Sequence, residues 1–322
     1  MESLAHKLAI LYLYDLMKCL VIKSTGSWYQ VVNNAGEIID CRIKGKFRIK
    51  DIRTTNPIAV GDKVEIEMEP DQGTGVIVKL EPRKNYIIRK SINLSKQSQI
   101  IAANLDQAFL IVTLASPRTS LGFIDRFLVT AEAYDIPAAL VFNKLDLFSE
   151  EGMEVLAEYE NIYQSIGYPC YKVSAMEGTN ISEIQDLLKD KVTLFSGHSG
   201  VGKSTLINAL IPDIKLKTGA VSDWSDKGQH TTTFAEMHDL SQGGYLIDTP
   251  GIRELGVFDI EPQVLGHFFP EIRERLNECR FHNCRHVNEP GCTVIEAVQD
   301  GEIEVSRYES YLSIFHGNDT RA

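Results

Sequence analysis

Hydrophobic and polar positions alternate with a short period through the first third of the chain, from Cys19 to about Arg89. Short β-prone runs there are separated by turn signals rich in Asn, Gly and Asp. The expected strands are Val21–Ile22, Trp28–Val32, Glu37–Cys41, Lys63–Glu67 and Gly75–Val78. About five short strands within roughly seventy residues are typical of a small β-barrel of the OB type.

From about Ile100 to Phe258 the pattern changes to buried strands that alternate with amphipathic helices. Continuous apolar runs are typical of strands in a parallel sheet, and apolar residues at helical spacing follow them. The pattern therefore predicts a three-layer α/β region. Its expected strands are Phe109–Leu114, Ala138–Phe142, Val192–Ser196 and Tyr245–Ile247, and its expected helices lie around Phe123–Tyr134 and Val155–Ile166.

The charge distribution changes the picture of a uniformly acidic protein. The 322 residues carry a formal net charge of −11, with 43% hydrophobic and 24% charged residues. Residues 19–100 hold 14 Lys/Arg against 9 Asp/Glu, whereas residues 101–322 hold 17 against 33. This predicts a basic N-terminal region on an acidic body, so the net charge does not exclude a nucleic-acid partner.

An eight-residue segment after the expected strand Val192–Ser196 fits the pattern G-x-x-x-x-G-K-[ST]. Its glycines let backbone N–H groups converge on phosphate oxygens at a helix N-terminus, where the helix dipole favours anions. Lys203 is expected to reach the β- and γ-phosphates, and the Ser204 hydroxyl to bind Mg²⁺. The predicted phosphate-binding residues are Gly197, His198, Ser199, Gly200, Val201, Gly202, Lys203, Ser204 and Thr205.

Two loops that follow expected strands predict recognition of guanine, and hence of GTP and GDP. Asp146 can accept from both N1–H and the exocyclic amine of guanine, and adenine offers no such pair of donors. Lys144 is expected to lie over the ring face, and Asn143 to join this loop to the phosphate loop. Ser174 and Ala175 follow a further short strand, where the Ala175 N–H is expected to reach guanine O6.

Two later segments predict contacts to the metal ion and the γ-phosphate. Asp248 follows the strand Tyr245–Ile247 and is placed to hold Mg²⁺ through water, and the Gly251 N–H is placed to sense the γ-phosphate. A threonine of the polar loop 228–233 is expected to complete the Mg²⁺ shell. Thr232 is the preferred candidate, with its two neighbours Thr231 and Thr233 left open.

Three cysteines and a histidine near the C-terminus predict a structural zinc site. Cys279, Cys284, His286 and Cys292 form the spacing C-x₄-C-x-H-x₅-C. Three thiolates and one imidazole fill a tetrahedron and leave no open position, which excludes a catalytic role for the ion. His282 is a competing ligand on spacing alone. One zinc ion would hold together a segment too small to depend on its own core.

A basic segment in the expected barrel predicts an RNA-binding face. Five cations alternate with apolar residues or glycine, which places them on one side of an extended segment. Trp28, Tyr29 and Phe47 lie near enough in sequence to offer stacking surfaces, and OB barrels bind nucleic acid on such faces. The predicted RNA-binding residues are Arg42, Lys44, Lys46, Arg48 and Lys50.

The order of these elements resembles the circularly permuted GTPases, because the Asn-Lys-x-Asp and Ser-Ala elements precede the phosphate loop. More narrowly, residues 19–310 resemble the small-subunit-dependent ribosomal GTPase family called RsgA or YjeQ. The resemblance includes the Gly-x-His-Thr-Thr-Thr loop and the Cys-x-Phe segment. It implies an OB domain, a permuted GTPase domain and a zinc domain, and it favours His286 over His282 as zinc ligand.

The resemblance implies a GTPase that acts on the small ribosomal subunit and its rRNA, late in the maturation of that subunit. His230, with Lys203 and Thr232, is a candidate catalytic residue, because Ile252 stands where Ras-like proteins carry a water-positioning glutamine. A non-hydrolysing RNA-binding switch and a GTPase for the large subunit remain as alternatives.

We expect a cytoplasmic monomer that does not bind membranes, since no apolar run is long enough for a membrane span and no signal peptide is recognised. The predicted organisation is multidomain α/β. Its parts are an N-terminal extension (1–18), an OB-fold RNA-binding domain (19–90), a circularly permuted GTPase domain (91–257) and a helical zinc-binding domain (258–322).

Overall fold

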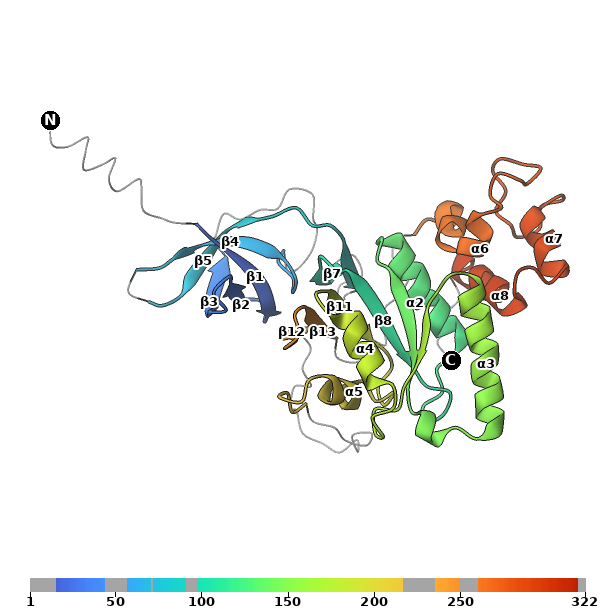
Figure 1. Cartoon of the computed structure of the whole chain (residues 1–322). Coiled ribbons are helices and arrows are strands. Elements are labelled where there is room, and N and C mark those ends of the chain that lie inside the picture. Colours follow the sequence, from blue (N-terminus) through green and yellow to red (C-terminus); the bar gives the residue numbers. More distant parts are fainter. Residues whose placement is uncertain are drawn as a thin grey trace, which may run out of the picture. The chain divides into compact units, whose positions relative to one another are not determined.

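The computed structural model in Figure 1 describes residues 16–43, 57–70, 72–90, 98–216, 235–249 and 260–317. These residues form two compact units. The smaller unit contains the described residues up to Leu105, together with 235–239 and 247–249, and the larger unit contains the others. The cysteine cluster therefore belongs to the same unit as the phosphate loop. The predicted domain boundaries stay predictions.

The smaller unit is built around a five-stranded β-barrel, which confirms the predicted OB-type fold. Strands β1, β2 and β3 are antiparallel neighbours, β4 pairs antiparallel with both β1 and β5, and the parallel pair β3–β5 closes the barrel. Alternate side chains point inward, so that Val21, Val31, Cys41 and Ile77 are fully buried. The strands are β1 (Met17–Ser24), β2 (Tyr29–Asn33), β3 (Ile38–Ile43), β4 (Lys63–Met68) and β5 (Gly75–Leu80).

Three strands of the smaller unit have no counterpart among the expected elements. Strands β6 (Tyr86–Lys90) and β7 (Ser98–Ala103) form an antiparallel pair. Strand β12 (Glu236–Asp239) pairs antiparallel with β1, and Nζ of Lys23 lies 2.6 Å from Oε1 of Glu236 across this pair. Each of these strands is short or mixes polar and apolar residues, so it gives a weak periodic signal.

The larger unit contains a parallel β-sheet with helices on it, as the sequence predicts (Figure 1). The strand order is β10–β9–β8–β11, and the first half of β13 follows β11. Every residue of β8 is buried, which requires cover on both faces of the sheet. The strands are β8 (Gln107–Val112), β9 (Ala138–Phe142), β10 (Cys170–Lys172), β11 (Val192–Ser196) and β13 (Tyr245–Asp248).

Helices α4 and α5 pack on one face of this sheet, where Ile184 and Leu206 share a core with Phe109 and Phe195. Helix α2 packs against β8 and β9, and α3 packs against β10. The helices of this part are α2 (Leu121–Ala133), η1 (Leu145–Leu147), α3 (Glu150–Ser165), α4 (Ile181–Leu188) and α5 (Lys203–Leu210).

The C-terminal segment of the larger unit, residues 260–317, packs on α2. Val129 of α2 lies in one core cluster with Leu265, Phe269 and Tyr311. The segment contains η2 (Pro262–Phe268), α6 (Pro270–Arg273), α7 (Thr293–Gln299) and α8 (Val305–Phe315). Across the described ranges, no helix has both the length and the apolar character that a membrane span needs.

Candidate nucleotide site and metal centre

The predicted phosphate loop lies at the carboxyl end of the buried strand β11 and leads into α5. A side chain at Gly197 would place its Cβ 2.7 Å from the carbonyl oxygen of Ile111, and one at Gly202 would lie 2.5 Å from Nδ2 of Asn143. Both positions have positive φ, so both require glycine. Lys203 is only 8% exposed at the first turn of α5. The loop therefore has the close backbone approach and the helix N-terminus that phosphate binding needs.

The side chain of Asn143 joins three loops. Its Nδ2 donates to the Val201 carbonyl in the phosphate loop at 2.9 Å, and its Oδ1 accepts from the Ala175 N–H at 3.1 Å. Asn143 is 1% exposed, so both bonds are protected from water. The structure thus brings the predicted base-recognition residues to the phosphate loop.

The carboxylate of Asp146 is positioned by a second bond between the base-recognition loops. Ser174 donates its hydroxyl to Oδ1 of Asp146 at 2.5 Å, and the Ser174 oxygen accepts from the Glu177 N–H. Ser174 is 1% exposed, whereas Asp146 is exposed at the edge of the sheet. A buried hydroxyl therefore orients a carboxylate that a ligand can reach.

A segment without a recognised motif also contacts the predicted nucleotide-binding residues. The Ser116 carbonyl accepts from Nζ of Lys144 at 2.6 Å. The ring of Phe123 in α2 stacks on His198, with 3.6 Å between the centroids. Phe123 has the spacing of a core residue, and the Ser116-Pro117 pair marks only a turn, so neither pattern indicates this role.

The predicted magnesium and γ-phosphate contacts are described only in part. Ser204 is half-buried in the first turn of α5. Asp248 ends β13 and is grouped with the smaller unit, where burial lowers the pKa of His238 and the charge of Asp248 opposes that shift. His230, Thr232 and Gly251 lie outside the described residues.

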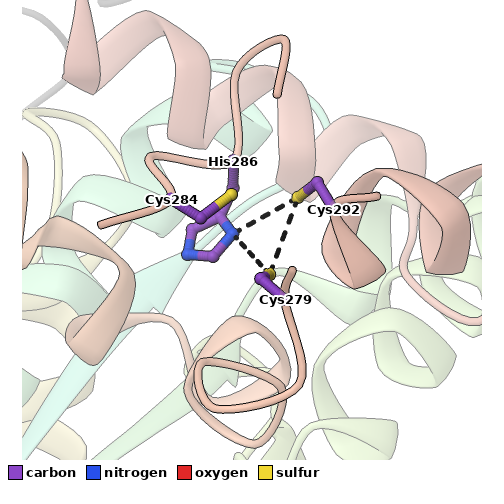
Figure 2. Close-up of side chains that lie close together, drawn as sticks. All are labelled: Cys279, Cys284, His286 and Cys292. Atoms are coloured by element: carbon purple, nitrogen blue, oxygen red, sulfur yellow. Dashed lines mark hydrogen bonds between the residues drawn. The ribbon is translucent and has the colours of Figure 1, made fainter. Parts of the chain in front are cut away.

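Cys279, Cys284, His286 and Cys292 converge on one point, as Figure 2 shows. Their ligand atoms all lie within 4.8 Å of one another. Sγ of Cys279 lies 3.9 Å from Sγ of Cys292, and Nδ1 of His286 lies 3.5 Å and 3.4 Å from these two sulfurs. Tetrahedral zinc with ordinary bond lengths separates such donors by about 3.5–3.8 Å. The four donors therefore fit one zinc ion, and His282 is exposed outside the cluster.

Backbone hydrogen bonds hold the loop of His286 in shape. The carboxylate of Glu289 accepts from the N–H groups of Arg285, Val287 and Asn288 at 2.9–3.1 Å. Burial opposes the charge of this group, but these bonds outweigh burial and hold the pKa of Glu289 at about 2. The Tyr308 hydroxyl donates to the His286 carbonyl at 2.8 Å.

A buried charge cluster fixes the metal-binding segment to α2. Arg307 of α8 is 1% exposed and lies 2.7 Å from both Asp125 of α2 and Glu271 of α6. Asp125 also accepts from the Tyr163 hydroxyl at 2.9 Å, and the guanidinium lies 4.7 Å from the ring centroid of Phe269. The sequence analysis missed this cluster, because Arg307 and Asp125 are 182 residues apart.

The predicted RNA-binding face is described at one cation only. Arg42 projects from β3 and pairs with Glu69 at 2.5 Å, and this bond lowers the pKa of the glutamate. Lys44, Lys46, Arg48 and Lys50 lie outside the described residues. The expectation that Tyr29 offers a stacking surface is wrong: it is 1% exposed in the barrel core, and burial raises its pKa to about 12. The preceding residue, Trp28, is 46% exposed.

Two family descriptions match the chain over most of residues 18–258. The RsgA N-terminal domain matches residues 18–77, and the RsgA GTPase matches residues 80–258. A Bacteroides thetaiotaomicron protein named small ribosomal subunit biogenesis GTPase RsgA 2 is 56% identical over 303 residues, which cover 94% of this chain and 97% of the relative. A Flavobacterium psychrophilum protein named small ribosomal subunit biogenesis GTPase RsgA is 52% identical over 305 residues, with 94% of each chain covered.

Solved structures agree with these sequence relatives. YjeQ from Thermotoga maritima superposes with a TM-score of 0.75 at 39% identity and covers 94% of this chain and 98% of its own. YloQ, described as a circularly permuted GTPase, superposes with a TM-score of 0.72 at 31% identity, with 97% and 98% covered. The order of strands and loops in this chain is therefore the permuted one.

Proposed function

The chain belongs to the RsgA family of circularly permuted GTPases, and from this premise we propose that it hydrolyses GTP on the small ribosomal subunit, late in the maturation of that subunit. The observation that carries the nucleotide part is the pair of bonds from Asn143 to Val201 and Ala175. These bonds support one continuous site for the phosphates and the base. Two relatives that are 56% and 52% identical to this chain are named small ribosomal subunit biogenesis GTPases, and these names support the ribosomal part of the proposal.

The nucleotide is bound by backbone and side-chain groups of three loops. The N–H groups of residues 197–202 and the ammonium group of Lys203 bind the phosphates, with Thr205 in the same helical turn. Asp146 accepts from the guanine edge, Lys144 covers the ring, and the Ala175 N–H donates to O6. A base that lacks the donor pair leaves Asp146 without its bonds and is therefore bound less tightly.

Hydrolysis uses groups at the γ-phosphate end of the site. Ser204, Thr232 and, through water, Asp248 are the residues that would hold Mg²⁺, which would supply positive charge at the β- and γ-phosphates. His230 orients the attacking water, and the Gly251 N–H contacts the γ-phosphate. His230→Ala is expected to lower subunit-stimulated hydrolysis at unchanged GTP affinity. Wild-type turnover in this variant excludes the role.

The zinc ion has a structural role. The ion would be held by Cys279, Cys284, His286 and Cys292, which leave no open coordination position. It would therefore cross-link residues 279–292. Burial lowers the pKa of His286, which favours the neutral imidazole that a metal needs.

The barrel is the proposed contact to rRNA. Arg42, Lys44, Lys46, Arg48 and Lys50 form the cationic part, supported by the regional excess of Lys and Arg in residues 19–100. The pairing of Arg42 with Glu69 reduces its share of this charge. We propose that the protein is cytoplasmic and monomeric. Light scattering of the purified protein tests the oligomeric state.

Phosphate release with purified ribosomal subunits tests the function. We expect small subunits to stimulate GTP hydrolysis by at least tenfold, less so as salt rises, and Lys203→Ala to abolish it. Absence of stimulated release indicates a non-hydrolysing switch. Equal stimulation by large subunits supports the large-subunit alternative, which the names of the relatives do not favour.

A further inference from the structure

The segment of residues 116–123, which links β8 to α2, contacts the predicted nucleotide-binding residues at three points. The Ser116 carbonyl accepts the 2.6 Å bond from Lys144. The Pro117 ring lies against the phosphate loop, since a Cβ added to Gly200 would be 3.3 Å from Cδ of Pro117. Phe123 stacks on His198 with 3.6 Å between centroids and 30° between planes. One short segment therefore contacts both the base-recognition loop and the phosphate loop.

The segment is itself held firmly at both ends. At its start, the buried Thr113 and Thr119 bond each other twice through backbone and hydroxyl groups, and the Thr113 hydroxyl donates to the Pro117 carbonyl. At its end, Ser120 caps α2, and Phe123 is only 3% exposed. Two residues further along α2, Asp125 is fixed by Arg307. The contacts to the nucleotide loops therefore start from a rigid base.

We propose that residues 116–123 are a positioning element of the nucleotide site, in which Phe123 fixes the phosphate loop through His198. This inference rests on the proposed function. His198 and Gly200 flank the exposed Ser199 at the tip of the loop, so contacts at both positions set the direction of the backbone N–H groups. A loop that is ordered before the nucleotide arrives loses less conformational freedom on binding. Phe123 is buried in α2 and contacts the loop through His198, so it is a positioning residue whose expected effect is on nucleotide affinity.

The experiment compares Phe123→Leu with Phe127→Leu in the full-length protein. Both residues are buried phenylalanines of α2, four positions apart, and only Phe123 stacks on the phosphate loop. Affinity is measured with a fluorescent GDP analogue in Mg²⁺, and folding with circular dichroism. An aromatic pair is worth about 0.5–1.5 kcal/mol, so Phe123→Leu is expected to weaken GDP binding about three- to tenfold. Phe127→Leu is expected to stay within twofold of the wild type.

A double-mutant cycle separates positioning from general destabilisation. His198→Ala is expected to weaken binding as much as Phe123→Leu, and the double variant no more than either one, because the two rings act as a pair. When His198→Ala is instead combined with Phe127→Leu, the two fold-losses of GDP affinity are expected to multiply. In subunit-stimulated hydrolysis, KM for GTP rises in Phe123→Leu while kcat stays within about twofold.

Unchanged affinity in Phe123→Leu, or an equal loss in Phe127→Leu, overturns the proposal. If Phe123→Leu does not fold, His198→Ala decides the question: wild-type affinity in that variant also overturns it. A wild-type protein that binds GDP no better than ADP contradicts the proposed function instead, so the two failures are distinguishable.

Discussion

The base-recognition loops and the Cys/His cluster are both candidate ligand sites of the larger unit, but different forces hold them. In the loops, recognition groups bond directly to other parts of the protein, as Asn143 does to Val201 and Ala175 and as Asp146 does to Ser174. In the cluster, sulfur and nitrogen atoms approach one another at 3.4–3.9 Å, which are weak contacts unless a metal joins them.

This difference indicates which of the two sites needs its ligand in order to keep its structure. The described base-recognition loops are joined by bonds within the protein, so we expect GTP to add its binding energy to loops that are already in place. The Cys/His cluster would depend on its ion for stability, because the thiols offer each other only weak contacts. Removal of the ligand is therefore expected to distinguish the two sites.

Removal of zinc has the largest expected effect. Chelation, or Cys284→Ser, is expected to destabilise residues 260–317 by roughly 5 kcal/mol or more, since structural zinc contributes folding energy directly. Amide hydrogen exchange and zinc content are the measurements. Cys170→Ser is the control, because this half-buried thiol of β10 lies outside the cluster. Removal of nucleotide is expected to leave exchange in residues 143–146 within about tenfold. If removal of nucleotide speeds exchange in residues 143–146 as much as removal of zinc speeds it in residues 260–317, the two sites do not differ in their dependence on the ligand.

Arg307→Met follows in magnitude. It leaves Asp125 and Glu271 buried without their cation, and breaking a buried ion pair costs about 3–5 kcal/mol. Denaturant unfolding measures the loss. Neutralising the partners as well, with Asp125→Asn and Glu271→Gln, is expected to recover part of the stability. GTP affinity within twofold supports independent sites, whereas a parallel fall shows that α2 couples them.

Asn143→Ala acts on the nucleotide side. It removes two bonds between the loops, each worth about 1–3 kcal/mol when a buried partner is left unpaired, so GTP affinity is expected to fall about 10- to 100-fold. Asn85→Ala is a matched control: Asn85 is 6% exposed and makes two backbone bonds to Leu105 in the smaller unit. Calorimetric titration that finds equal affinities for both variants argues against a preassembled site.

Glu289→Gln has the smallest expected effect. The amide keeps an acceptor oxygen but loses the charge that binds three backbone N–H groups, which costs about 1 kcal/mol. Zinc release to a colorimetric chelator is expected to speed up severalfold. Glu278→Gln, at an exposed position beside Cys279, is expected to release zinc at the wild-type rate. Equal rates in all three proteins exclude a role for Glu289 in shaping the His286 loop.

The sequence predicted the elements whose signal is local. The boundaries of β9 and β11 were predicted as observed, because each is a short, mostly apolar run that is buried after its first residue. The fully buried β8 begins and ends two residues before the predicted strand Phe109–Leu114. The alternation that places Trp28 outside also places Tyr29 inside, so the error at Tyr29 was avoidable. Arg307 was missed for another reason: an ion pair between distant helices leaves no periodic trace in either one.

The contacts of residues 116–123 illustrate the same limit at the site. The spacing of Phe123 identifies a buried ring, but the choice of His198 as its neighbour depends on how α2 packs on the sheet at β8 and β9. Motifs identify groups that bind a ligand, whereas the residues that hold those groups in place need only shape and so vary in type. The candidate ligand-binding residues were therefore accessible from the sequence, and the residues that hold them in place were not.

The strand order of the larger unit has a consequence for synthesis of the protein. Strands β8, β9 and β10 are consecutive in the chain and adjacent in the sheet, and β11 joins on the opposite side of β8. As the nascent chain emerges with its N-terminal part first, the base-recognition half can form before the phosphate loop has been made. GTP can assist folding only after Lys203 has left the exit tunnel. In a GTPase of the usual order, the phosphate loop emerges first, so the permutation reverses the stage at which nucleotide concentration can influence biogenesis of the enzyme.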